Sequence, residues 1–466
     1  MKKRFAYGEF LPDRPAALSG ARGAWATADG FRPARAFSSI TPALSGILGG
    51  AAYVGSDGTA SLLSGTATNL YRYSGTAWSS VLGSLTATSW RFDQFDDLVI
   101  GVNGSAPVKF DLIGGTAAAL GGTPPTSDLV ATVRDQVFLA GDPSARNVLS
   151  ISGYLDAEGW TAGTNQSLSV PFKSGGEIMG LAGGETGLIL QKNAIRRATY
   201  TGDVTVWQFD EIAHNIGCMA KGSVASDGQL VFFLSEQGFK MTDRNTVIPI
   251  GDEKVDRWFF ARFSRSDIAR ITCAIDPRQT IVVWAMPGTP GLLLAYNWTG
   301  QRWATLEIDT SLIFSGFTAN ISLDALDALY PSGLDSIPYS LDSSVFAGGN
   351  PLLLIATAAG VVGAFSGDNQ EAQFTISPTE VEQGRRVRVR SALPLSDAVN
   401  ATVQIDARAR AGDSESATSS SSVRDNGSVP LRANGRFIGI EHTIPAGETW
   451  SYAVGIELEY EPEGGR

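Results

Sequence analysis

Short apolar runs separated by turn residues recur through most of this chain. Between Ile178 and Phe260 they read GLILQ, RRATY, VTVWQFD, QLVFFLS, GFKMT and TVIPI, and Gly, Asp, Asn or Pro interrupts them. Runs of this length that are rich in β-branched and aromatic residues are typical of β-strands. The turns 201–204 (TGDV) and 235–238 (SEQG) stand where antiparallel hairpins would reverse. The stretch is therefore predicted to form a four-stranded antiparallel meander.

The same rhythm extends from Leu44 to Phe374, and one phrase recurs in it. A tyrosine at the end of one run is followed by a polar turn and a tryptophan that opens the next run. The phrase occurs at Tyr73 and Trp78, Tyr154 and Trp160, Tyr200 and Trp207, and Tyr296 and Trp303. So many short strands leave a sandwich, a barrel or a propeller. With about 40 to 50 residues per blade, residues 46–375 are predicted to be a β-propeller of about six to eight blades.

The two ends of the chain differ from this central part. Residues 1–45 carry Pro12, Pro15, Pro33 and Pro42, which disfavour helix and central strand. We expect an extended N-terminal arm that lies on its own domain or on a neighbour, and we favour the neighbour. Residues 376–466 return to period-two alternation and predict a small C-terminal β domain. We expect a mobile Ser-rich loop at 411–428 and a hairpin around residues 445–447.

Two segments inside the predicted propeller have their own signals. Residues 254–266 (KVDRWFFARFSRS) place apolar side chains at one-turn spacings after Asp252, which predicts a short helix with that aspartate as N-cap. Residues 322–349 repeat Leu-Asp four times. Regular aspartates raise the possibility of a calcium site, but the dense Asp/Gly spacing and closing Glu of such loops are absent. An insertion capped by aspartate side chains is the favoured interpretation.

The formal net charge of −11 bears on the class of partner. Proteins that grip nucleic acid normally carry a basic stripe, so this acidic balance argues against tight DNA binding. It does not argue against DNA passing nearby, because an acidic surface repels phosphates.

Residues capable of catalysis or metal binding are few. Cys218 and Cys273 are predicted to be buried free thiols, and with His214 and His442 they do not make a zinc motif. His214 and His442 are each predicted to end a strand, because no partner residue completes a site with either. No nucleophile–base set, phosphate loop or dinucleotide motif occurs. We therefore predict no enzyme activity and no catalytic, cofactor or metal site.

One basic run is the only candidate contact site that the sequence offers. Arg386, Arg388 and Arg390 alternate with valines and would share one face of a strand. This face could meet DNA or an acidic partner subunit. A solvated face near Glu380 and Glu382 is the favoured alternative, because isolated charge runs are usually solvent-facing.

The chain has no targeting signal that we recognise. Its basic start, MKKRFAYGEFLPD, is not followed by the apolar core of a signal peptide, and no apolar run is long enough for a membrane helix. Synthesis in the cytoplasm is the expectation.

Several phrases resemble a family of virion proteins. GGETGLILQKNAIRRATYTGD, FDEIAHNIGCMAKGSV, LVFFLSEQGF, PIGDEKVDRWFF, AIDPRQTIVVWAMP, LLLAYNWTGQRW and NGRFIGIEHTIPAGETWSYAVGIEL are similar to the tail hub or nozzle proteins of short-tailed phages. These are also called packaged-DNA stabilisation or head-completion proteins. The arm (LPDRPAALSG) and GLDSIPYSLDSSVFAGG resemble the family as well, so the resemblance covers nearly the whole chain.

The resemblance implies a structural role in the virion tail. Its members are not enzymes, need no cofactor and assemble, typically as six copies, below the portal and adaptor proteins and above fibre or needle proteins. Genomic DNA is retained behind this assembly and passes through its channel at ejection, and no small-molecule substrate is involved. Two alternatives stay open: a glycan-binding or glycan-cleaving propeller, as in a tailspike, and a generic propeller scaffold for protein partners.

Overall fold

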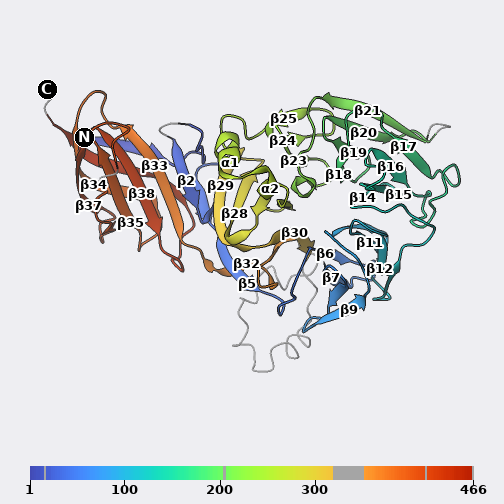
Figure 1. Cartoon of the computed structure of the whole chain (residues 1–466). Helices are drawn as coiled ribbons and strands as arrows, with labels where there is room; N and C mark the ends of the chain where they lie inside the picture. Colours follow the sequence, from blue (N-terminus) through green and yellow to red (C-terminus); the bar gives the residue numbers. More distant parts are fainter. Residues whose placement is uncertain (15–16, 203–205, 318–350, 415–416, 464–466) are drawn as a thin grey trace.

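Antiparallel strands form almost all of the regular secondary structure, and they gather into two parts (Figure 1). The computed structural model describes residues 1–14, 17–202, 206–317, 351–414 and 417–463. The Leu-Asp segment 322–349, and with it the question of an ion there, lies outside the described residues. The fold is all-β, with a β-propeller and a smaller β domain, as predicted.

The described residues of the propeller form seven four-stranded blades, within the predicted range. The first four are β6–β9 (Gly49–Val54, Ala60–Gly65, Leu70–Tyr73, Trp78–Leu82), β10–β13 (Arg91–Phe95, Leu98–Val102, Val108–Asp111, Ala117–Ala119), β14–β17 (Leu129–Val133, Gln136–Ala140, Val148–Ile151, Leu168–Pro171) and β18–β21 (Ile178–Ala182, Gly187–Gln191, Ala194–Tyr200, Trp207–His214). The last three are β22–β25 (Ala225–Ser226, Val231–Ser235, Gly238–Thr242, Val247–Pro249), β26–β29 (Thr272–Asp276, Ile281–Met286, Gly288–Asn297, Arg302–Thr310) and β30–β32 with β5 (Leu312–Phe317, Pro351–Ala356, Val362–Asn369, Arg35–Ser39).

The ring of blades is closed by strands from opposite ends of the propeller. The innermost strand β6 packs against β10 on one side and β30 on the other. The seventh blade takes its outermost strand, β5, from the N-terminal segment, which pairs with β32 in register Phe365 opposite Phe37. Early and late parts of the chain therefore complete one blade together, which prevents the ring from opening without loss of strand hydrogen bonds.

The repeated Tyr–Trp phrase marks the outer hairpins of three blades. Tyr73 lies opposite Trp78, Tyr200 opposite Trp207, and Tyr296 opposite Trp303. The ring centroids of these pairs are 5.4, 5.3 and 4.8 Å apart. Such cross-strand aromatic pairs stabilise a hairpin and fix its register. The phrase at Tyr154 instead lies in a loop between β16 and β17.

The smaller domain is a sandwich of two sheets, seen at the left of Figure 1. One sheet has the order β3-β4-β39-β34-β37, with β1 also on β39 (Ala24–Ala26, Phe31–Pro33, Ala453–Pro462, Val387–Ser396, Val429–Gly435 and Lys2–Ala6). The other has the order β2-β33-β38-β35-β36 (Leu18–Arg22, Ala372–Glu380, Phe437–Ile444, Thr402–Arg408, Ser421–Ser422). Along β37 every second residue, beginning with Val429, is buried, and the residues between them are not. One face of the strand therefore turns toward the centre of the sandwich.

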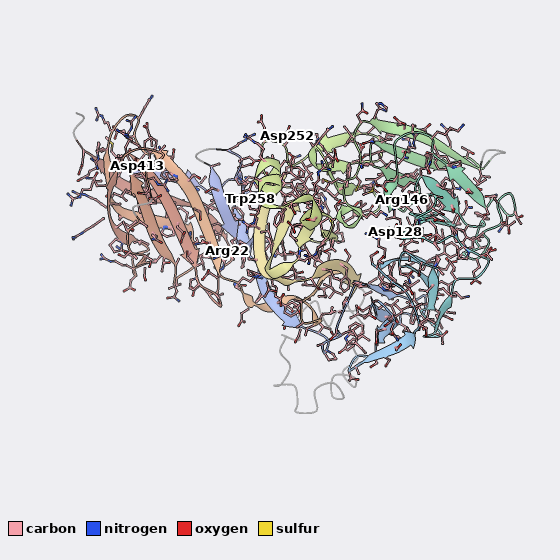
Figure 2. All side chains as sticks on the ribbon, viewed as in Figure 1. Arg22, Asp128, Arg146, Asp252, Trp258 and Asp413 are labelled. Carbon is pink, nitrogen blue, oxygen red and sulfur yellow. The ribbon has the colours of Figure 1, made fainter. Side chains whose placement is uncertain are left out.

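The sandwich and the propeller share a sheet and a core. Strand β2 pairs with β33 of the sandwich and, in parallel at Arg22 opposite Thr305, with β29 of the sixth blade. The Arg22 guanidinium, labelled in Figure 2, lies 3.0 Å from Glu307 and 3.1 Å from Glu371. One apolar cluster extends without a break from Trp284 of the propeller to Phe374 of the sandwich. The two parts therefore form one packed unit.

The N-terminal segment is extended, and its strands pair with other strands of the same chain. It supplies β1 to β4 to the sandwich and β5 to the propeller. The expectation that it rests on a neighbouring subunit is thus wrong. Prolines flank the stretch from Leu18 to Arg22 without entering it, so β2 is free to act as a central strand.

Several local predictions need correction. Helix α1 (Asp256–Arg262) lies in the predicted segment, but Asp252 does not cap it: Asp13 accepts hydrogen bonds from the main-chain N–H groups of Arg257 and Trp258, at 2.9 and 2.8 Å. Residues 445–452 are not a hairpin turn, because β38 and β39 belong to opposite sheets. They cross between the layers of the sandwich.

Two further boundaries differ from the sequence prediction. The predicted border at residue 376 falls inside β33, which lies wholly in the sandwich. The described part of the Ser-rich loop folds back along β35, where the Thr418 N–H donates to Ile405 O at 2.8 Å. Helix α2 (Arg265–Ile268) and the 3-10 turn η1 (Lys221–Ser223) complete the structure.

Candidate functional site

The arginines singled out by the sequence lie on the outside of the sandwich. Arg388 and Arg390 are exposed on β34 and alternate with the buried Val387 and Val389, whereas Arg386 is exposed just before the strand. Arg390 lies 2.5 Å from Glu461 on the neighbouring strand β39. The arginine face is therefore interrupted by a carboxylate, and its contact with DNA or protein stays a prediction.

The two histidines lie in different parts of the molecule, one on the propeller and one in the sandwich. His214 ends β21, is exposed and contacts Glu211 at 2.8 Å. His442 lies inside β38, so the prediction that it ends a strand is wrong. It is buried in the sandwich, where its Nδ1 lies 2.8 Å from Tyr7 Oη and where burial lowers its pKa to about 4.

Both cysteines are free; Cys218 is buried, as predicted, whereas Cys273 is only half-buried. Burial raises the pKa of Cys218 to about 11. A thiol with this pKa stays protonated at neutral pH, so it is a poor nucleophile.

A cavity runs along the propeller axis. Its volume is ≈950 Å³, and all seven innermost strands or the segments just before them contribute to its wall. Glycine and small apolar side chains, among them Gly50, Ala131 and Gly180, form much of this wall. Small residues leave room at the axis, where seven strands converge.

Charged side chains gather at one end of this cavity. Asp128, which lies in the propeller away from the sandwich (Figure 2), accepts a hydrogen bond of 2.5 Å from Lys221 Nζ at its Oδ2. The Arg91 Nη1 donates to the main-chain oxygen of the same aspartate at 2.9 Å. Burial lowers the pKa of Arg91, and the nearby Asp128 carboxylate partly offsets this shift. Two cations from different blades, Arg91 and Lys221, thus contact Asp128, which belongs to a third blade.

Two carboxyl groups have raised pKa values. Burial raises the pKa of Asp93 and that of Asp256 to about 6. Each accepts main-chain hydrogen bonds: Asp93 from Thr132 at 2.5 Å, and Asp256 from Phe239 at 3.1 Å. These bonds join neighbouring strands and the helix to the sheet, which is a structural role.

The charged cluster could not be found from the sequence. Arg91, Asp128 and Lys221 are separated by 37 and 93 residues, and none belongs to a recognisable motif. Their positions do share one feature, because each residue stands just before or at the start of an innermost strand of the structure. It becomes readable only when the blade register is known.

Metal ligands and membrane helices were also sought in the described ranges. They contain no group of three or more His, Cys, Asp or Glu side chains placed to hold a metal ion. None of their helices is long and apolar enough to cross a membrane.

Comparisons with known proteins show no family for this chain and only distant structural similarity. No family model and no curated protein matches the chain. The extracellular domain of a putative one-component system from B. thetaiotaomicron is 10% identical, with a TM-score of 0.45 over 76% of this chain and 42% of that one. The Neurospora crassa Pan2 WD40 domain is 9% identical (TM-score 0.37, 59% of this chain and 86% of that one). A chain of a mitotic checkpoint complex is 7% identical (TM-score 0.41, 73% and 96%).

Proposed function

We propose that this chain is a structural subunit of the tail hub or nozzle of a short-tailed phage. In this role, copies of the chain form a ring, of six copies by the family resemblance, between the portal–adaptor proteins and the fibre or needle proteins. The ring retains packaged DNA and lets it pass during ejection. The protein would then act in the virion tail after synthesis in the host cytoplasm.

The observation that carries the proposal is the position of the phrases that resemble the family. They fall on blades four to six, on α1 and on strands β37 to β39. Blades five and six, α1 and strands β37 to β39 contribute to the apolar cluster that joins the propeller to the sandwich, whereas blade four packs in neighbouring clusters. Most of the longer phrases thus lie on elements that pack closely together, which suits a ring subunit that must stay rigid.

The charge on one propeller face is compatible with passing DNA. The turns between the first and second strands of a blade all lie on the same face, because every blade runs in the same direction. In the six blades where this turn is described, the acidic residues are Asp57, Asp96, Asp97, Asp135, Glu185 and Asp227, and the basic residues are Arg134 and Arg278. We call this the carboxylate face. Such a surface repels phosphates and would limit adhesion of a DNA strand.

Reconstitution with the neighbouring tail proteins tests the proposal. The purified chain is mixed with the portal and adaptor proteins encoded beside it and imaged by negative-stain electron microscopy. Closed rings, or added density below the adaptor, are the expected result. A chain that stays monomeric with these partners and instead binds or hydrolyses the host surface polysaccharide would replace the hub function with the glycan-directed alternative.

A further inference from the structure

The charged end of the axial cavity opens on the face opposite the carboxylate face. Arg91 is the first residue of β10, Asp128 directly precedes β14, Lys221 lies in η1 before β22, and Arg270 follows α2 before β26. Since the innermost strands of all blades start on the same face, these four residues share one mouth of the cavity. Arg91, Lys221 and Arg270 line it.

Most N–H donors of the Arg91 guanidinium are unused within the described part of the chain. In the described part of the chain it donates a single hydrogen bond, from Nη1 to a main-chain oxygen. Its Nε and Nη2 have no protein partner there, although burial already disfavours the charged form. A desolvated guanidinium is stabilised when it donates to an anion, and its planar fork matches two oxygens of a carboxylate or a phosphate.

The charge balance at this mouth is positive in an acidic protein. Arg91, Lys221 and Arg270 bring three positive charges, and Asp128 supplies one negative charge, which Lys221 already contacts at 2.5 Å. Asp93 lines the cavity farther along β10, and although burial raises its pKa to about 6, it is mostly ionised at neutral pH, so three cations face two carboxylates. Low-dielectric walls concentrate the field of the three cations on the cavity.

We propose that this mouth binds a small oxyanion, with Arg91 as the main ligand-binding residue and Lys221 and Arg270 as its supporting cations. The ligand class is a phosphate or a small organic carboxylate, whose oxygens would receive the free Arg91 donors. The cavity volume of ≈950 Å³ is ample for such a molecule. This binding site is independent of the proposed tail function, because it requires neither assembly nor DNA.

Calorimetric titration of the purified full-length chain tests the proposal. Inorganic phosphate and citrate are titrated separately in a buffer free of both. Saturable binding of one or both is expected, and it should weaken at least about tenfold in Arg91→Gln and measurably in Arg270→Gln. Binding of phosphate alone assigns a phosphoryl ligand, and binding of citrate alone assigns a carboxylate.

A matched control is available on the same face. Arg146, labelled in Figure 2, is exposed, pairs with Glu177 at 3.2 Å and does not line the cavity. Arg146→Gln makes the same change of charge and should leave binding unaltered. Arg270 is exposed, so Arg270→Gln keeps the test valid if Arg91→Gln fails to fold. Absence of saturable binding, or equal binding by wild type and both cavity variants, would overturn the proposal.

Discussion

Tyr7 Oη and His442 Nδ1 share a hydrogen bond of 2.8 Å in the buried centre of the sandwich. The two residues are 435 positions apart, and the Tyr7 ring also stacks on Phe374 at 4.7 Å between centroids. The start of the chain is therefore part of the core. It is not a free arm that depends on a partner subunit for its order.

Deletion of residues 1–40 should abolish the cooperative fold. It removes β5 from the seventh blade and β2 from the junction between the propeller and the sandwich, and it exposes the apolar cluster around Phe374. We expect insoluble protein or loss of the thermal unfolding transition, measured by circular dichroism. A truncated chain that unfolds at the wild-type temperature would show that the segment is dispensable.

Acid should destabilise the sandwich through His442. Its pKa is about 4 in the folded chain and 6.5 as an ordinary histidine. Above pH 6.5 the ring is neutral in both states and the shift costs nothing. As pH falls from 6.5 to 4 the unfolded chain gains a proton that the folded chain does not. The free energy of unfolding therefore falls, by about 3 kcal/mol in total.

Other groups titrate in the same range, so a reference variant is needed. Asp93 and Asp256 have folded pKa values of about 6, which act in the opposite direction between pH 6 and 3.8. Urea unfolding of wild type and His442→Gln isolates the histidine contribution. The stability advantage of wild type over the variant should shrink by about 3 kcal/mol between neutral and acid pH. An advantage that is independent of pH would contradict the buried neutral histidine.

Gly23 should be irreplaceable at the junction. Its φ is +72°, and a Cβ there would lie 1.8 Å from the Glu371 carbonyl oxygen. Gly46 has nearly the same φ, +74°, but a Cβ added to it would meet no atom within 4 Å. Gly23→Ala should lower the free energy of unfolding by several kcal/mol, and Gly46→Ala by only about 1 kcal/mol from backbone strain. Equal losses in urea unfolding would mean that the close packing at Glu371 is not maintained in solution.

Trp207 should stabilise the fourth blade through its ring nitrogen. The Nε1–H donates to Gln136 Oε1 at 2.8 Å in a buried position. Trp207→Phe leaves that oxygen without its donor and should cost about 1 to 3 kcal/mol beyond the lost contact area. Gln136→Leu removes the same bond and also the one that Gln136 Nε2 donates to Ser152 O at 2.6 Å, so the losses of the two single variants should add to more than the loss of the double variant. Urea unfolding of both single variants and the double variant measures this coupling, and strictly additive losses would argue against the bond.

The sequence predicted the propeller because local and tertiary signals agree there. The pairs Tyr200–Trp207 and Tyr296–Trp303 are close in the sequence, so a repeated phrase reveals a hairpin. The N-terminal strands were misplaced because β2 pairs with residues more than 280 positions away, where no local pattern indicates the partner. The Arg91–Asp128–Lys221 cluster was missed for the same reason. Residues 445–452 look like a turn, and only packing shows that they cross between two sheets.

Location in the virion tests the central claim most directly. Particles of the phage or induced prophage that encodes this chain are imaged by cryo-electron microscopy at a resolution that shows strands. The account predicts a ring of propellers below the portal and adaptor, each joined to a sandwich through one continuous sheet that includes β29, β2 and β33. Virions whose tail density lacks this fold, or that carry it only on peripheral fibres, would contradict the assignment to the tail hub.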